Sequence, residues 1–202
     1  MAADWEARYG DERGLDFTPE PLLVEVAERL PPGRALDLAC GAGRHALYLA
    51  GLGWRVTAVD SSRAGIDVVR RRAADLVIEA VRADLEAHEF TIEPDAWDLI
   101  CDFFYLQRDL FAPIRAGVRP GGVFVGAMHL FDDAPDARPR DPTYLLHAGE
   151  LRAAFAGWKI LYYSEGPQPG HRRRAARIVA RKEQKPGTDG TFPVYQTGKP
   201  LP

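Results

Sequence analysis

Short β-type runs alternate with helix-type runs through most of this chain, and this alternation constrains the fold more than any other feature. The expected strands are 34–40, 54–60, 76–82, 97–101 and 123–128, and the expected helices are 21–29, 43–50, 63–74 and 106–118. The last of these helices is expected to bend or begin late because of Pro113, and a turn is expected at 119–122. Such alternation is typical of a parallel sheet with helices on both faces. The predicted fold class is therefore α/β, with a doubly wound, mostly parallel sheet.

The regular alternation stops after residue 128. The segment 131–142 is rich in Asp and Pro and is expected to form a surface loop. A helix is expected at 148–156, followed by two closing strands at 158–164 and 175–181. The Gly/Pro-rich segment between these strands has no room for a parallel crossover helix, so an antiparallel hairpin is expected.

Composition and charge exclude several classes of protein. The chain has 202 residues and a formal net charge of -3, which does not favour a nucleic-acid partner held by bulk electrostatics. Cys40 and Cys101 lie in apolar runs and show neither a disulfide framework nor a zinc spacing, so we expect a cytoplasmic location and no metal site. The charged N-terminal segment lacks the apolar stretch of a signal peptide, and no apolar run approaches the roughly 20 residues that span a bilayer.

The strongest local signal is the segment 37–43 (DLACGAG), in which a strand runs directly into a glycine turn and a helix. In a doubly wound sheet, ligands bind at the carboxyl ends of the strands. Gly41 and Gly43 have no Cβ atoms, which at these positions would keep a ligand away from the backbone. Asp60 ends the second strand, where its carboxylate is placed to accept hydrogen bonds from both hydroxyls of an adenosine ribose.

The glycine turn alone does not choose the cofactor, because 41–46 also fits the loose dinucleotide fingerprint G-x-G-x-x-G/A. Three features favour S-adenosylmethionine. Asp37 lies four residues before the first glycine, where its charge suits a methionine amino group and opposes a pyrophosphate. Asp84 and Leu85 end the third strand and suit the amino group and ring face of adenine. The chain also closes with an antiparallel pair in place of a second mononucleotide-binding half.

The motifs resemble those of class I S-adenosylmethionine-dependent methyltransferases, in that family's order, over residues 34 to 128. They read ALDLACGAGRHALYLA, VTAVDSS, VRADLE, WDLICDFFYLQRDLF and VRPGGVFV. The similarity is greatest to small-molecule members of the tellurite-resistance type. It implies a seven-stranded sheet with an antiparallel last strand. It also implies an N-terminal cover segment and helix over 1–30 and a cofactor-binding domain over 31–182. The polar, Pro/Gly-rich composition of 183–202 predicts a loosely ordered tail.

The resemblance also implies roles for single residues. Gly41 and Gly43 would line the methionine portion, and Asp60 the ribose. Trp5, Arg8 and Tyr9 are similar to a W-x-x-R/K-Y segment that folds over the cofactor in family members. The full set of expected cofactor-binding residues is Trp5, Tyr9, Asp37, Gly41, Gly43, Asp60, Ser61, Asp84, Leu85 and Cys101.

The acceptor is expected beyond the fourth strand, around the segment 101–106 (CDFFYL). This segment lacks the N-P-P-Y or D-P-P-Y pattern of enzymes that methylate exocyclic amino groups of bases. Asp102, Tyr105 and His129 are the expected transfer residues. For His129, as for His45 and His147, a solvent-facing or capping role stays open.

Other residues near the acceptor side are also ambiguous. Phe103 either lines the methyl-transfer pocket or packs the next helix against the sheet, and for Phe104 the packing role is the favoured interpretation. The run 171–174 (HRRR) either holds an anionic acceptor or RNA phosphates, or is a solvated flank of the hairpin.

The sequence therefore predicts in-line methyl transfer from S-adenosylmethionine to a small-molecule or soft-anion acceptor. One alternative is an NAD(P)-dependent oxidoreductase that uses the same glycine turn. Asp37 and the lack of a Tyr-x-x-x-Lys pair argue against it. Another alternative is a catalytically inactive module that retains S-adenosylmethionine binding.

Overall fold

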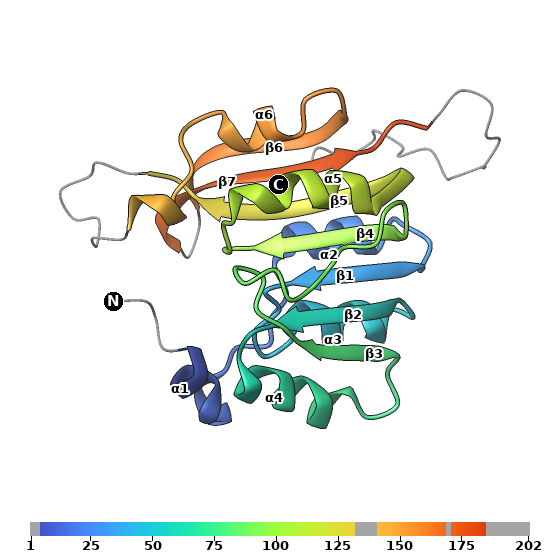
Figure 1. Ribbon diagram of the computed structural model, residues 1–202, viewed down its shortest axis with the longest axis vertical. Coiled ribbons are helices and arrows are strands. Elements are labelled where there is room, and N and C mark those ends of the chain that lie inside the picture. Colours follow the sequence, from blue (N-terminus) through green and yellow to red (C-terminus); the bar gives the residue numbers. More distant parts are fainter. Residues whose placement is uncertain (1–4, 132–140, 169–170, 185–202) are drawn as a thin grey trace.

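The computed structural model describes residues 5–131, 141–168 and 171–184. Their core is a seven-stranded sheet (Figure 1). The strands are β1 (Arg34–Leu38), β2 (Arg55–Asp60), β3 (Ile78–Arg82), β4 (Trp97–Phe103), β5 (Val118–His129), β6 (Lys159–Gln168) and β7 (His171–Arg181). Their order across the sheet is β3-β2-β1-β4-β5-β7-β6.

The strand directions confirm the predicted fold class. The pairs among β1 to β5 are parallel, and β7 is antiparallel to both of its neighbours, β5 and β6. The predicted closing strands therefore form the expected antiparallel hairpin. The order reverses between β1 and β4, and at such a switch point the carboxyl ends of two strands leave a crevice for a ligand.

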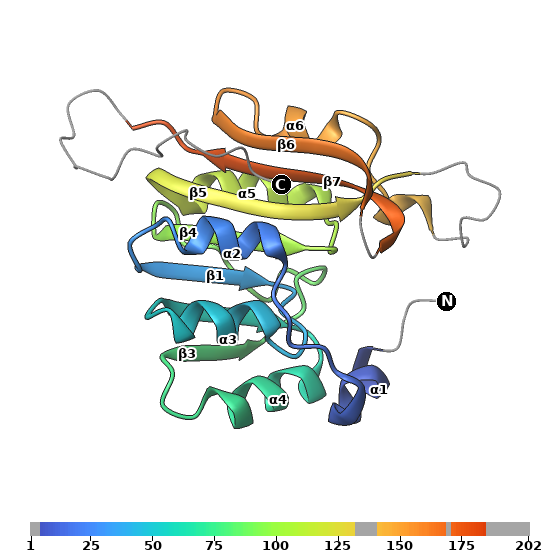
Figure 2. The same cartoon turned by 180° about the vertical axis from the view of Figure 1, so that it is seen from behind.

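Helices cover both faces of the sheet. They are α1 (Trp5–Gly10), α2 (Pro21–Ala27), α3 (Arg44–Gly51), α4 (Arg63–Ala73), α5 (Phe111–Gly117) and α6 (Glu150–Ala154), with short 3-10 turns at Glu12–Gly14, Arg108–Leu110 and Pro142–Tyr144. The helices α2 and α3 lie over one face, and α5 and α6 lie over the other (Figures 1 and 2). The short helix α1 lies apart from these layers, beside the start of α4 (Figure 2).

Two hydrophobic clusters fill the two sides of the sheet, and the central strands supply both. In β4, Leu99 and Cys101 belong to the cluster under α2 and α3, whereas Ile100 belongs to the cluster under α5 and α6. Successive side chains of a strand point to opposite faces, so a strand buried on both faces is a continuous apolar run. This explains why the apolar runs of the sequence located the strands.

Two sequence-based boundaries differ in the structure. The helix expected over 106–118 begins late, as Pro113 predicted: a 3-10 turn precedes α5, and Pro113 is the third residue of α5, in the first turn, where a missing N–H costs no helical hydrogen bond. The turn expected at 119–122 lies inside β5 instead. There the pairing with β4 shifts between Trp97 and Leu99, and Gly121 takes a φ of 84° within the resulting bulge.

Several predictions concern residues outside the described ranges. Most of the loop expected at 131–142 and nearly all of the tail expected at 183–202 lie there, because 132–140 and 185–202 are not described. The division into 1–30, 31–182 and 183–202 stays a prediction. Within the described residues, no helix combines the length and apolar character needed to cross a membrane.

Candidate active site

The turn after β1 brings three chain segments into close contact. Ala39, Gly41 and Gly43 take left-handed φ values of 51°, 57° and 85°. A Cβ on Gly43 would lie 2.6 Å from Cγ2 of Val69 in α4, and a Cβ on Gly41 would collide with the phenol of Tyr9. The two predicted glycines are therefore required both by backbone conformation and by the close approach of α4 and α1.

Asp60 joins the end of β2 to the glycine turn. Its Oδ2 accepts a hydrogen bond from Gly41 N at 2.8 Å, and its Oδ1 accepts one from Ser62 N at 2.8 Å. The residue is 9% exposed, and burial raises its pKa while the two backbone hydrogen bonds oppose the increase. Each carboxylate oxygen has a further lone pair, so the group retains acceptor capacity for ribose hydroxyls.

Asp37 belongs to β1, and its side chain reaches the N-terminus of α3. Its Oδ2 accepts from Ala46 N at 3.0 Å, and its Oδ1 accepts from the Cys101 thiol at 3.4 Å. Burial raises the pKa of Asp37 to about 7, against the effect of these two hydrogen bonds. A carboxyl group of the protein thus already takes the helix N-terminal position that a pyrophosphate uses in dinucleotide-binding folds.

His45 is buried beside Asp37, so it is neither a solvent-facing nor a capping histidine. Its Nδ1 lies 3.9 Å from Asp37 Oδ1, and its ring centroid lies 4.5 Å from that of Phe103. Burial lowers the pKa of His45 to about 3, and the nearby Arg44 acts in the same direction. The imidazole is therefore neutral at neutral pH.

This neutral histidine predicts acid sensitivity. Between pH 6.5 and about 3 the unfolded chain binds a proton at residue 45 that the folded chain does not, so stability falls as pH falls. From pH 7 to pH 5 we expect a loss of about 2 kcal/mol from this residue. The variant His45→Phe should show a correspondingly shallower loss in urea unfolding at the two pH values.

The control for this prediction is His147→Gln, at an exposed position, which should leave the pH dependence close to that of the unchanged chain. Asp37 and Asp60 have raised pKa values and so act with the opposite sign. Asp60 keeps its surroundings in every variant and therefore cancels in the comparison, whereas the contribution of Asp37 changes with its neighbour at residue 45. An unchanged pH dependence in His45→Phe would show that this histidine is not buried in its neutral form.

The N-terminal helix α1 places only one of its two predicted residues on the glycine turn. Tyr9 packs over Gly41 and against Gly65, and burial raises its pKa to about 12. Trp5 stacks on Tyr9 with ring centroids 5.8 Å apart, but it is 45% exposed, with the Arg8 guanidinium 5.1 Å from its ring. Tyr9 therefore lies at the turn, while Trp5 supports it from the surface.

The residues expected around adenine, Asp84 and Leu85, follow β3, and Ser61, another expected cofactor-binding residue, follows the neighbouring strand β2. Asp84 is half-buried, and its Oδ1 accepts from Glu86 N at 2.9 Å. Ser61 is exposed, and its carbonyl accepts from Arg82 Nε at 3.2 Å. Leu85 is buried in the cluster under α5 and α6. The polar residues are thus at the predicted edge, whereas the Leu85 side chain belongs to the core.

The end of β4 holds a buried carboxyl group, that of Asp102, and a buried thiol, that of Cys101. Asp102 is 2% exposed, and among the described residues its Oδ1 has no hydrogen-bond partner. Burial raises the pKa of Asp102 well above its usual range, and the nearby Asp37 adds to the effect. Burial likewise raises the pKa of the Cys101 thiol, so Cys101 is protonated and donates to Asp37.

The chain leaves β4 through a strained residue. Phe104 has a φ of 67°, which is costly for a residue with a Cβ, and its ring stacks on His129 at 4.9 Å. Tyr105 donates from its hydroxyl to Gln107 Oε1 at 2.7 Å. Phe103 is buried against α3, on the face of the sheet opposite to α5, so it does not pack the next helix as the packing alternative predicted. Of the predicted residues, His129 at the end of β5 thus stacks on Phe104, and Tyr105 follows Phe104 in the chain.

Sequence reasoning missed one buried ionic group on this side of the sheet. Glu20, 3% exposed before α2, lies 3.3 Å from Arg44 Nη2 and 3.5 Å from Arg177 Nη2. Glu6 was also missed; it contacts the start of α4. No local pattern marks either residue, because their partners come from distant segments.

Two further sequence expectations concern metal and the basic run. Over residues 5–131, 141–168 and 171–184, no group of three or more His, Cys, Asp or Glu side chains could hold a metal ion. In the basic run 171–174, the side chains of residues 171 and 172 lie outside the described part. The role of this run stays a prediction.

Sheet order, glycine turn and strand-end acids together define the fold of class I S-adenosylmethionine-dependent methyltransferases. The structure is similar to that of an S-adenosylmethionine-dependent methyltransferase from Mesorhizobium loti, with a TM-score of 0.64 and 21% identity over 80% of this chain and 96% of that one. It is also similar to TehB from Haemophilus influenzae, with a TM-score of 0.73 and 23% identity over 89% and 67% of the two chains.

Residues 16–179 match the family of the tellurite resistance protein TehB, and the chain belongs to this family. It is 29% identical over 151 residues to the probable S-adenosyl-L-methionine-dependent methyltransferase TehB of Haemophilus influenzae, covering 71% of this chain and 52% of the relative. It is 32% identical over 168 residues to Hemagglutinin 1 of Eikenella corrodens, covering 79% and 55%. The chain thus spans about half the length of these curated relatives.

Proposed function

We propose that this protein binds S-adenosylmethionine at the carboxyl ends of β1 to β4 and transfers its methyl group to a small acceptor. The observation that carries the proposal is the Asp60 carboxylate, which is hydrogen-bonded to the backbone of the glycine turn and of residue 62. It lies where a ribose would bind in this fold. Membership of the TehB family supports the same cofactor.

The residues present suit this cofactor better than a dinucleotide. Asp60 supplies acceptors for two hydroxyls, and the Gly41 N–H holds this carboxylate against the glycine turn. Asp37 supplies an acidic group near the turn, which suits an ammonium group and opposes a phosphate. Asp84, at the end of β3, supplies a carboxylate for an amino group of adenine.

When bound, the cofactor supplies a methyl group activated by a sulfonium, and the reaction needs alignment and exclusion of water. Tyr9 covers the glycine turn and shields it from solvent. Burial raises the pKa of Asp102 well above its usual range, and its buried Oδ1 has no hydrogen-bond partner among the described residues, so we propose that Asp102 contacts the acceptor. Tyr105 follows the strained Phe104 in the chain and His129 stacks on it, and we propose that both orient the acceptor.

The acceptor we propose is a small molecule or a soft anion. Such a nucleophile needs no protein base, and the raised pKa of Asp102 fits a site that orients the acceptor without deprotonating it. We also propose a cytoplasmic location, supported by the free thiols of Cys40 and Cys101, which are both buried.

Calorimetric titration tests the cofactor. The purified protein should bind S-adenosylmethionine and S-adenosylhomocysteine and should show no heat of binding with NAD(P)H. Binding of NAD(P)H alone would instead support the oxidoreductase alternative and contradict the proposal. In the second step, the protein is incubated with methyl-radiolabelled cofactor and with the metabolites of a cell extract. Label is expected in a small molecule, and cofactor binding without any S-adenosylhomocysteine release would indicate an inactive binding module.

A further inference from the structure

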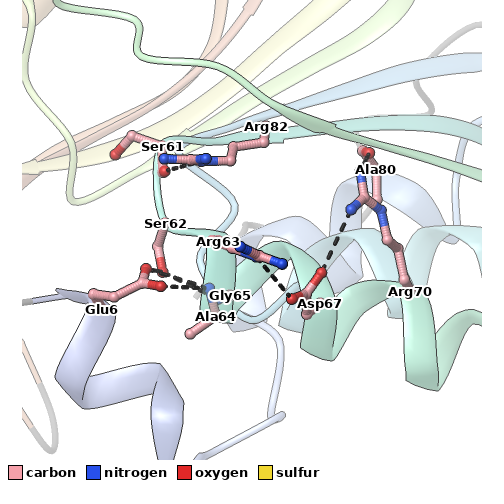
Figure 3. A network of polar contacts seen from close by, with 10 residues as sticks. All are labelled: Glu6, Ser61, Ser62, Arg63, Ala64, Gly65, Asp67, Arg70, Ala80 and Arg82. Atoms are coloured by element: carbon pink, nitrogen blue, oxygen red, sulfur yellow. Dashed lines mark hydrogen bonds and ion pairs between the residues drawn. The ribbon is translucent and has the colours of Figure 1, made fainter.

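The N-terminal segment is fastened to α4 at two places. At the first, Glu6 Oε2 accepts from the Ser62 hydroxyl at 2.7 Å, and Oε1 accepts from Ala64 N at 3.1 Å (Figure 3). At the second, Glu12 Oε1 accepts from Arg71 Nη2 at 2.6 Å. Both contacts hold the same segment on the same helix, but only the first touches the end of β2.

The first contact continues into the ribose-binding carboxylate. The Ser62 hydroxyl donates to Glu6 and accepts from Gly65 N at 3.0 Å, so its orientation is fixed at both ends. The backbone N–H of Ser62 donates to Asp60 Oδ1, and Gly41 N–H donates to Asp60 Oδ2. A continuous chain of hydrogen bonds therefore runs from α1 through residue 62 to the glycine turn.

Asp60 depends on this backbone for its orientation. In the described part of the chain, Asp60 accepts hydrogen bonds from backbone N–H groups and from no side chain. The rotamer of its carboxylate therefore follows the conformation of residues 60–62. Glu6 is suited to hold that conformation, because the hydrogen bonds from Ser62 and Ala64 lower its pKa and keep it an ionised acceptor.

We propose that Glu6 is a positioning residue for cofactor binding. It holds Ser62, and through it Asp60, in the orientation in which Asp60 accepts the ribose hydroxyls. Glu6 itself makes no contact with the cofactor in this account. The inference rests on the proposed function, because it assumes that the ribose binds to Asp60.

The test compares two acidic residues that fasten the same segment. S-adenosylhomocysteine affinity is measured by calorimetry for Glu6→Ala and Glu12→Ala. Glu6→Ala is expected to lose about threefold to tenfold in affinity, the scale of one or two net hydrogen bonds. Glu12→Ala should lose less than about twofold, because an exposed ion pair contributes little and does not reach Asp60. Equal losses would show that both residues merely tether the segment, and would overturn the proposal.

A double-mutant cycle separates action through Ser62 from independent action. In a Ser62→Ala background, adding Glu6→Ala should weaken binding by less than about twofold, because the relay is already broken. The same fold-loss in both backgrounds would overturn the proposal. The conservative variant Glu6→Gln retains an acceptor oxygen and is expected to bind more tightly than Glu6→Ala. Equal affinity of these two variants would show that the hydrogen bond is not the cause.

A ligand-free measurement keeps this test separate from the proposed function. Amide hydrogen exchange at Gly41 and Ser62 reports the two hydrogen bonds to Asp60 directly. Exchange at both should quicken in Glu6→Ala and stay unchanged in Glu12→Ala, and unchanged exchange in Glu6→Ala would overturn the relay. If the unchanged chain fails to bind S-adenosylhomocysteine, the proposed function fails, and the exchange result still decides whether Glu6 positions Asp60.

Discussion

Replacing Asp60 by alanine is expected to weaken S-adenosylmethionine binding by about tenfold to a few hundredfold, because each lost hydrogen bond to a charged acceptor costs about 1.5–3 kcal/mol. The variant loses the acceptors for the ribose. It also frees the N–H groups of Gly41 and Ser62, so the glycine turn itself loses its attachment to β2. The upper part of the range is therefore expected. Calorimetry with S-adenosylhomocysteine measures the change.

A neighbouring aspartate supplies the control for this experiment. Asp67 lies on the exposed side of α4, within 3.7 Å of Arg63 and 3.4 Å of Arg70 (Figure 3). Asp67→Ala removes the same charge from the same region, and it should leave affinity within about twofold because exposed ion pairs are weak. If folded Asp60→Ala binds as tightly as Asp67→Ala, the ribose does not lie at the end of β2.

Gly43→Ala is expected to lower the free energy of unfolding by about 2–4 kcal/mol. The left-handed φ of 85° is costly for alanine, and the new Cβ would lie 2.6 Å from Cγ2 of Val69. Val69 is fully buried, so neither it nor α4 is free to move aside. Urea unfolding at neutral pH measures the change.

Gly149→Ala separates the two causes. Gly149 precedes α6 as Gly43 precedes α3, with a similar left-handed φ of 78°, but a Cβ there would meet nothing within 4 Å. Its loss should be about 1 kcal/mol, the cost of the backbone conformation alone. Similar losses in the two variants would mean that α4 yields to the added methyl group, and that the turn tolerates the contact.

The positions of the strands and of the glycine turn were predictable because their causes are local. A strand buried on both faces is an apolar run, and a left-handed turn before a helix selects glycine, as at Gly41 and Gly43. Asp60 was predictable for the same reason, since parallel strands end at one edge. The late start of the helix expected over 106–118 was predictable from Pro113, which is tolerated in the first turn of a helix.

The sequence by itself determined the α/β fold class, the antiparallel closing hairpin and the strand ends on which Gly41 and Asp60 lie. These depend on periodicity and turn chemistry within a few residues. Only the tertiary structure decided that Glu6 contacts Ser62, 56 positions away, and that Glu20 lies between Arg44 and Arg177. Such pairs depend on strand order and on helix placement. A charged residue carries no local mark of its partner, so three-dimensional packing alone selects it.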